Sequence, residues 1–187
     1  MEYSNIRSYD LYRDLLEKYK HLSNDSIDEI IEKSIECAQK IYKEIDKDAP
    51  ILEHFEKYKV KIFEIDNDKI KMLSFYDKSS NELVVVNNNI RKYLENYNLV
   101  SSAEITEDRL RQIILAHEFY HVYEMNEKNI YTYSNIYKRK FLGFTWKDKI
   151  PEASEIGANE FSKLYNNLGF NPIIMNKIIE CSYSKKE

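Results

Sequence analysis

Apolar residues recur at helical spacing through the first part of the chain. Positions three and four apart are apolar over residues 9–19 and 27–45, which predicts a short helix and then a longer one capped within residues 24–26. Pro50 suits the first turn of a third helix, over residues 50–55. We expect these helices to serve as scaffold.

The spacing changes to alternation in the next part of the chain. Residues 60–63, 70–76 and 83–86 fit β-strands, and the polar stretches 66–68 and 77–81 between them fit turns. Because the three strands follow one another so closely, we expect them to form an antiparallel meander.

Helical spacing returns in the second half. A helical turn is expected over residues 90–97, a longer helix begins after Thr106, and another begins at Pro151. A closing amphipathic helix over residues 173–179 belongs either to the core or to a partner interface, and residues 126–148 lack a clear period and are expected to be irregular. The sequence thus predicts an α+β fold, mainly helical, with a small three-stranded antiparallel sheet before the helix after Thr106.

The composition suits a single domain. A chain of 187 residues, 43% of them hydrophobic, can bury a sizeable core. We expect one domain over residues 1–187, in which N-terminal helices (1–48) and a C-terminal helix (169–187) flank a core over residues 49–168. The 28 basic and 32 acidic residues are interspersed and give a net charge of −4, so no basic surface for nucleic acid is expected.

The sequence also predicts a cytoplasmic protein. Charged residues interrupt the first 20 positions, where a signal peptide would need an apolar run, and no stretch is apolar enough to span a membrane. Cys37 and Cys181 are far apart and form no C-x-x-C motif, so a disulfide framework is not expected. Abundant Lys, Ile, Asn and Tyr are typical of an AT-rich bacterial or phage genome.

The segment from His117 to His121 carries the chemistry, because it matches the pattern H-E-x-x-H. Residues four apart lie on one face of a helix, so His117 and His121 can bind one zinc ion while Glu118 beside it handles a proton. Thr106 can cap this helix, whose apolar positions form a buried stripe. The alternative is a pair of core histidines with ordinary hydrogen-bond partners, which the interposed Glu118 disfavours.

A catalytic zinc usually takes three protein ligands and leaves a fourth position for water. The other histidines, His21 and His54, lie in segments expected to be surface helix. A carboxylate from the helix that begins at Pro151 is therefore the better candidate.

That helix offers three glutamates. Glu155 is favoured because Asn159, one turn later on the same face, can hold a ligand histidine in the right tautomer. Glu152 has only Ile156 in the corresponding place, and Glu160 points off the shared face. Both fit solvated positions on the helix surface.

Residues 114–121 and 155–161 resemble the ImmA/IrrE family of zinc peptidases, whose pattern is A-H-E-hydrophobic-G-H followed by E-x-x-A-N-x-F-A. The order of helices, small sheet and motif helix is also similar, over approximately residues 30–168. The resemblance implies a zincin-like fold of the thermolysin-like gluzincin class. It also implies the zinc ligands His117, His121 and Glu155, the general base Glu118, and Asn159 beside the ligands.

The chain departs from the family pattern at three places. Tyr120 stands where the family usually has Gly, Ser162 where it usually has Ala, and residues 164–167 replace its usual L-L-M-P ending. The metal centre is compatible with these changes, but the groove and the substrate are not carried over.

The expected function is that of a zinc-dependent endopeptidase acting on a protein. Glu118 would take a proton from zinc-bound water as it attacks, then deliver the proton to the leaving amine. Family members cleave a repressor of a mobile element or a stress-response regulator, so the resemblance implies a partner such as a helix-turn-helix repressor. Tyr131, Tyr133 and Tyr137 could stabilise the oxyanion but fit packing roles, and none is assigned.

Two other functions remain open. A zincin-like regulatory, sensor or toxin–antitoxin component would bind zinc and a protein partner without peptidase turnover. A metal-free structural domain would carry the histidine pair as core residues only. Glu118 favours catalysis, because zinc binding alone does not require it.

Overall fold

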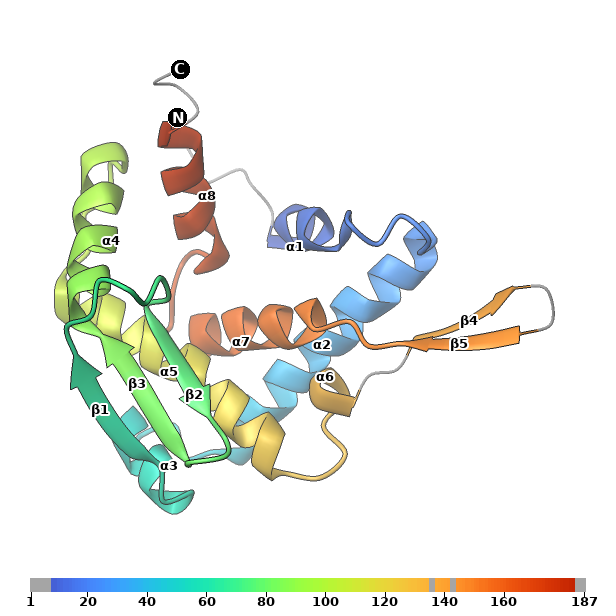
Figure 1. The fold of residues 1–187 in the computed structure, drawn as a ribbon, viewed down its shortest axis with the longest axis horizontal. Coiled ribbons are helices and arrows are strands. Elements are labelled where there is room, and N and C mark those ends of the chain that lie inside the picture. The colour runs from blue at the N-terminus through green and yellow to red at the C-terminus, as the bar shows by residue number, and fades with distance from the viewer. Residues whose placement is uncertain (1–7, 135–136, 142–143, 184–187) are drawn as a thin grey trace.

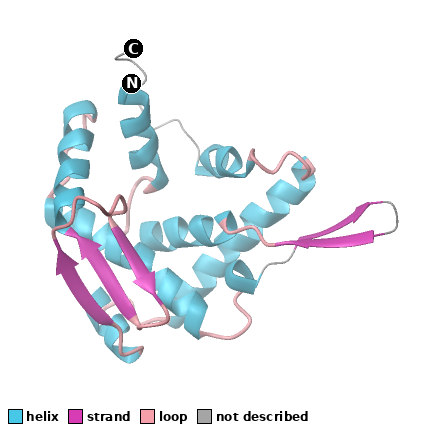
Figure 2. Ribbon diagram, viewed as in Figure 1, coloured by secondary structure: helices cyan, strands magenta, loops and turns pink. Residues whose placement is uncertain are grey.

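The computed structural model describes residues 8–134, 137–141 and 144–183, and Figures 1 and 2 show their arrangement. The helices are α1 (Ser8–Leu16), α2 (Asn24–Glu44), α3 (Ile51–Lys57), α4 (Asn87–Val100), α5 (Glu107–Asn126), α6 (Tyr131–Ser134), α7 (Glu152–Tyr165) and α8 (Ile173–Tyr183). The strands are β1 (Lys61–Ile65), β2 (Ser74–Asp77), β3 (Glu82–Val86), β4 (Tyr137–Phe141) and β5 (Phe144–Asp148). The predicted α+β class with a small sheet is confirmed.

The long helices begin close to where the sequence predicts them. Thr106 caps α5 by accepting a hydrogen bond from the backbone N–H of Arg109. Ser23, just before the expected cap residues, caps α2 through the N–H of Ser26. α4 is longer than the predicted helical turn, because buried Ile90 and Tyr97 give it a face that packs on the core.

The three-stranded sheet is mixed, which corrects the predicted antiparallel meander. β3 lies at its centre, with β1 parallel on one side, Lys61 opposite Glu82, and β2 antiparallel on the other. β3 takes the centre because it is the most apolar strand, with Leu83, Val85 and Val86 buried. β2 therefore lies at an edge of the sheet.

The predicted strand over residues 70–76 begins only at Ser74. The side-chain amide of Asn89 donates hydrogen bonds to the carbonyl oxygens of Ile70 and Met72, both at 2.8 Å. These bonds hold the preceding stretch as a loop against the start of α4.

Residues 126–148 are not irregular as expected. They contain the end of α5, the short helix α6 and a hairpin in which β4 and β5 pair antiparallel. The hairpin extends away from the helices (Figure 1), although residues 142–143 lie outside the described part of the chain. The hairpin was not predicted, because its two strands pair with each other rather than with the three-stranded sheet.

α5 is the helix around which the core is built. α7 packs along α5, and α2 packs along α7. α5 buries residues on several sides, among them Ile113, Phe119, Tyr120 and Val122, and β2 lies against it. Within residues 8–134, 137–141 and 144–183, no helix combines the length and apolar character needed to cross a membrane.

Candidate metal centre

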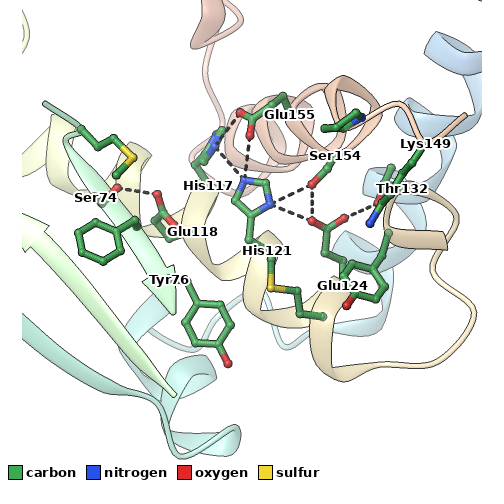
Figure 3. Close-up of a pocket in the computed structure, with 15 residues that line it drawn as sticks. Ser74, Tyr76, His117, Glu118, His121, Glu124, Thr132, Lys149, Ser154 and Glu155 are labelled. Atoms are coloured by element: carbon green, nitrogen blue, oxygen red, sulfur yellow. Dashed lines mark hydrogen bonds and ion pairs between the residues drawn. The ribbon is translucent and has the colours of Figure 1, made fainter. Parts of the chain in front are cut away.

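Three predicted ligands come together between α5 and α7 (Figure 3). The Nε2 atoms of His117 and His121 lie 3.2 Å apart. The carboxylate oxygens of Glu155 lie 3.4 Å from Nε2 of His117 and 3.6 Å from Nε2 of His121. Two ligand atoms about 2.0–2.1 Å from a tetrahedral zinc are about 3.3–3.4 Å apart, so this spacing fits zinc. In the described part of the chain, no other group of three such side chains is close enough to hold a metal.

The other two glutamates of α7 are engaged elsewhere, and neither is the solvated surface charge that the sequence predicts. Glu152 accepts hydrogen bonds from Lys18 and Tyr19, which tie α7 to the end of α1. Glu160 is buried and accepts from Asn171 at 3.3 Å. Glu152 thus holds the segment after α1 onto α7, and Glu160 holds the segment before α8 onto it.

The remaining histidines lie away from the centre. His21 is exposed in a turn rather than on a helix. His54 is on α3 as predicted, but it is buried, which corrects the expected surface position, and its ring packs against Phe119 and Tyr165.

The ring of His121 is held on the side that faces away from Glu155. Its Nδ1 atom lies 2.9 Å from Oε1 of Glu124 and 3.0 Å from Oγ of Ser154. Glu124 is 1% exposed and also accepts hydrogen bonds from Ser154 and from Thr132, the latter at 2.7 Å. Figure 3 shows this cluster beside the ligands.

Asn159 does not hydrogen-bond to either histidine of the site. Its amide donates to the backbone oxygen of Glu155 at 2.8 Å, within its own helix. The predicted hydrogen bond from Asn159 to a ligand histidine is therefore absent from the structure. The sequence carried a signal for Glu124, which follows His121 by three positions and so lies on the same helix face.

Protonated His121 and ionised Glu155 stabilise each other's charged forms. Burial alone would lower the pKa of His121, but the hydrogen bond to Glu124 and the charges of Glu155, Glu118 and Glu124 raise it to about 9. Burial also opposes ionisation of Glu155, but His117 and His121 lower its pKa to about 2. Glu155 is therefore an ionised carboxylate at neutral pH.

The candidate base Glu118 lies next to the ligands and is 7% exposed. The hydroxyl of Ser74 donates to its Oε1 atom at 2.6 Å. Ser74 is the first residue of β2, so the edge strand holds the carboxylate in place. The sequence offered no signal for this contact, because it depends on where β2 lies in the sheet.

A groove passes the metal centre along β2. Two cavities of about 480 and 470 Å³ lie on either side of the ligands and share part of their walls. The shared residues are Met72, Ser74, His117, Glu118 and Glu155. The first cavity continues along β2 past Phe75 and Tyr76, and the second is lined by apolar side chains of α5.

The three tyrosines considered for oxyanion stabilisation differ in position. Tyr133 lines the first cavity, with the ammonium of Lys149 4.5 Å from the centre of its ring. Tyr131 packs beside Lys33 of α2. The side chain of Tyr137 lies outside what the structure describes.

Comparisons of this chain with protein-family models, with curated proteins and with solved structures gave no match.

Proposed function

We propose that this protein is a zinc-dependent endopeptidase that hydrolyses a peptide bond in a protein substrate. The observation that carries the proposal is the close approach of three side chains, His117, His121 and Glu155, whose nearest nitrogen and oxygen atoms lie 3.2 to 3.6 Å apart. The buried carboxylate of Glu118 lies beside them in an open groove. A site that only binds a metal needs neither the carboxylate of Glu118 nor the groove.

Two imidazoles and one carboxylate are a typical donor set for catalytic zinc. His117, His121 and Glu155 would hold the ion and leave the site with a formal charge of +1. Bound zinc supplies a Lewis acid that activates water, whose pKa falls from about 15.7 to about 7, and that polarises a carbonyl group.

Glu118 is placed to move protons. It lines both cavities that flank the candidate ligands. It would accept a proton from the attacking water and deliver it to the leaving amine. Ser74 donates to one carboxylate oxygen of Glu118 and so orients the group toward the groove.

The edge strand β2 offers a place for an extended peptide. Its neighbour in the sheet is β3, and its other edge is not paired with a strand of the described chain. A peptide that pairs antiparallel to β2 would run from Tyr76 toward Met72. Its residues on the carboxyl side of the scissile bond would then enter the cavity lined by Ile113 and Ile114, which favours an apolar side chain there.

The resemblance of residues 114–121 and 155–161 to ImmA/IrrE peptidases supports a regulatory substrate. The first candidate is a helix-turn-helix repressor or regulator of a mobile element, encoded beside this protein. Such a substrate would present its cleavage site in an extended segment, because the groove follows a β-strand edge.

The test of this function compares wild type with Glu118→Gln. The zinc-loaded proteins are incubated with the regulator encoded by the neighbouring gene, and fragments are identified by mass spectrometry. We expect Glu118→Gln to keep its zinc but to cleave about 10² to 10⁴ times more slowly, because the amide cannot accept the proton. The exposed Glu56 of α3 provides a matched control, Glu56→Gln, which should cleave like wild type.

Undiminished cleavage by Glu118→Gln would refute the role of Glu118. A wild-type protein that binds zinc but cleaves no neighbour-encoded regulator would instead support the alternative, a regulatory, sensor or toxin–antitoxin component that binds zinc and a partner without turnover.

A further inference from the structure

We propose that Glu124 is the positioning residue of the metal centre, and that it sets zinc affinity by fixing the ring of His121. This inference rests on the zinc site of the proposed function, but it does not depend on peptidase turnover. Glu124 itself lies outside the set of three ligand atoms.

The hydrogen bond between Glu124 and His121 has a defined direction. Oε1 of Glu124 lies 2.9 Å from Nδ1 of His121, and a carboxylate can only accept, so Nδ1 carries a proton. Nε2 is then the nitrogen that gives its lone pair to a metal once its own proton has left, and it is the atom that faces His117 and Glu155. A ring flipped about its axis would lose this arrangement.

Glu124 is itself held in place by hydrogen bonds from two hydroxyl groups. Thr132 donates its single hydroxyl proton to Oε2 of Glu124 at 2.7 Å. The hydroxyl of Tyr120, 2.8 Å from that of Thr132, must therefore donate to Thr132. Ser154 donates to Oε1 from the other side.

Three of these protons, from His121, Thr132 and Ser154, are donated to Glu124, and the fourth, from Tyr120, is donated to Thr132. Tyr120 and Thr132 are fully buried and Glu124 nearly so, so water cannot replace the bonds easily. The chain Tyr120–Thr132–Glu124–His121 connects the core to a metal ligand. The cluster stabilises the carboxylate in one orientation and ties α5, α6 and α7 together at the centre.

The consequence is an effect on metal affinity. An acceptor on the far nitrogen of a ligand histidine fixes its tautomer and raises its basicity, and loss of such a partner weakens metal binding about 10- to 100-fold. In Glu124→Gln the side-chain amide has nearly the same shape as the carboxylate, but it lacks the negative charge that raises the basicity of His121.

The test measures zinc dissociation constants by competition with a chromophoric chelator. Glu124→Gln should bind zinc about 10 to 100 times more weakly than wild type. Thr132→Val, which removes the donor to Glu124 together with the acceptor of the Tyr120 hydroxyl, should weaken binding in the same direction but less. Glu127→Gln makes the same charge change on an exposed side chain at the end of α5 and should bind like wild type.

A spectroscopic readout separates positioning from general destabilisation. In the zinc-loaded wild type, ring-nitrogen NMR should show a protected proton on Nδ1 of His121. In zinc-loaded Glu124→Gln that proton should exchange with water faster, while the rest of the spectrum indicates the same fold.

Three outcomes decide the matter. Equal zinc affinity for Glu124→Gln and Glu127→Gln would overturn the inference and leave the zinc site intact. No zinc binding by wild type would overturn both this inference and the proposed function. Weakened binding in Glu124→Gln, together with no cleavage of any substrate by wild type, would support the inference and count against the peptidase alone.

Discussion

The Nε2 atom of His121 can carry either a proton or a metal. Its neighbouring carboxylates raise the pKa of His121 to about 9, so in chelator-treated protein the ring is protonated at neutral pH. The pKa of Glu155, at about 2, means that this ligand is already ionised. Zinc must therefore displace a proton from His121 but none from Glu155.

The sign of the pH dependence follows from this competition. Below about pH 9, raising the pH removes the competing proton, so zinc affinity should rise by up to about tenfold per pH unit for one displaced proton. Above pH 9 this contribution should level off. Calorimetry at pH 7.5 in buffers of different ionisation enthalpy should find at least one proton released per zinc bound, one from His121 and a further fraction from zinc-bound water. Binding without proton release would contradict the assignment of His121 as a ligand.

The proximity of His117 and His121 could be predicted because it depends on local spacing. Residues four apart, such as His117 and His121, are one turn apart in any α-helix, and Glu118 lies beside them because it is the next residue after His117. The groups that hold them could not be predicted in the same way. Ser74 and Ser154 reach the site only through the placement of β2 and α7 against α5, and Asn159 bonds to its own helix instead.

α5 and α7 approach closely where the large side chain of Tyr120 faces Gly157, which has no side chain. Tyr120 is fully buried and lies directly over Gly157. A Cβ atom on Gly157 would lie 2.2 Å from the hydroxyl oxygen of Tyr120 and 2.5 Å from its ring. Tyrosine at position 120, where the resembling family usually has glycine, is thus accommodated by glycine on the facing helix.

The substitution Gly157→Ala should therefore destabilise the protein by about 1–3 kcal/mol, because overpacking outweighs the better helix propensity of alanine. Urea unfolding measures the change. Gly169→Ala serves as the control, since nothing lies within 4 Å of a Cβ at that position. In a Tyr120→Ala background the same Gly157→Ala change should cost little. An equal cost in both backgrounds would show that the two side chains do not compete for this space.

Helices were easier to predict than the sheet. The spacing of apolar residues locates α2, α5 and α7, because each helix packs one continuous face on the core. Strand order depends on which strand is buried deepest, and that is decided by packing against α5 rather than by neighbours in sequence. Three short strands in succession therefore predict a sheet without fixing the central position of β3.

The candidate metal centre joins two helices, because Glu155 of α7 lies 34 and 38 positions after His121 and His117 of α5. Contacts outside the site hold these helices together. Ser162 of α7 donates to the carbonyl oxygen of Ile113 in α5 at 2.7 Å, and α2 packs along the other side of α7. Ser162 is another departure from the resembling family, and here its hydroxyl is buried and satisfied.

The zinc content of the purified protein, measured by plasma mass spectrometry, tests the proposed metal site. Wild type should contain about one zinc per chain, His117→Ala and Glu155→Ala should lose it, and Glu152→Ala should retain it because that carboxylate bonds to Lys18 and Tyr19. Zinc retained in Glu155→Ala would exclude Glu155 as the third ligand. A wild-type protein that contains no zinc, even after reconstitution, would contradict the account.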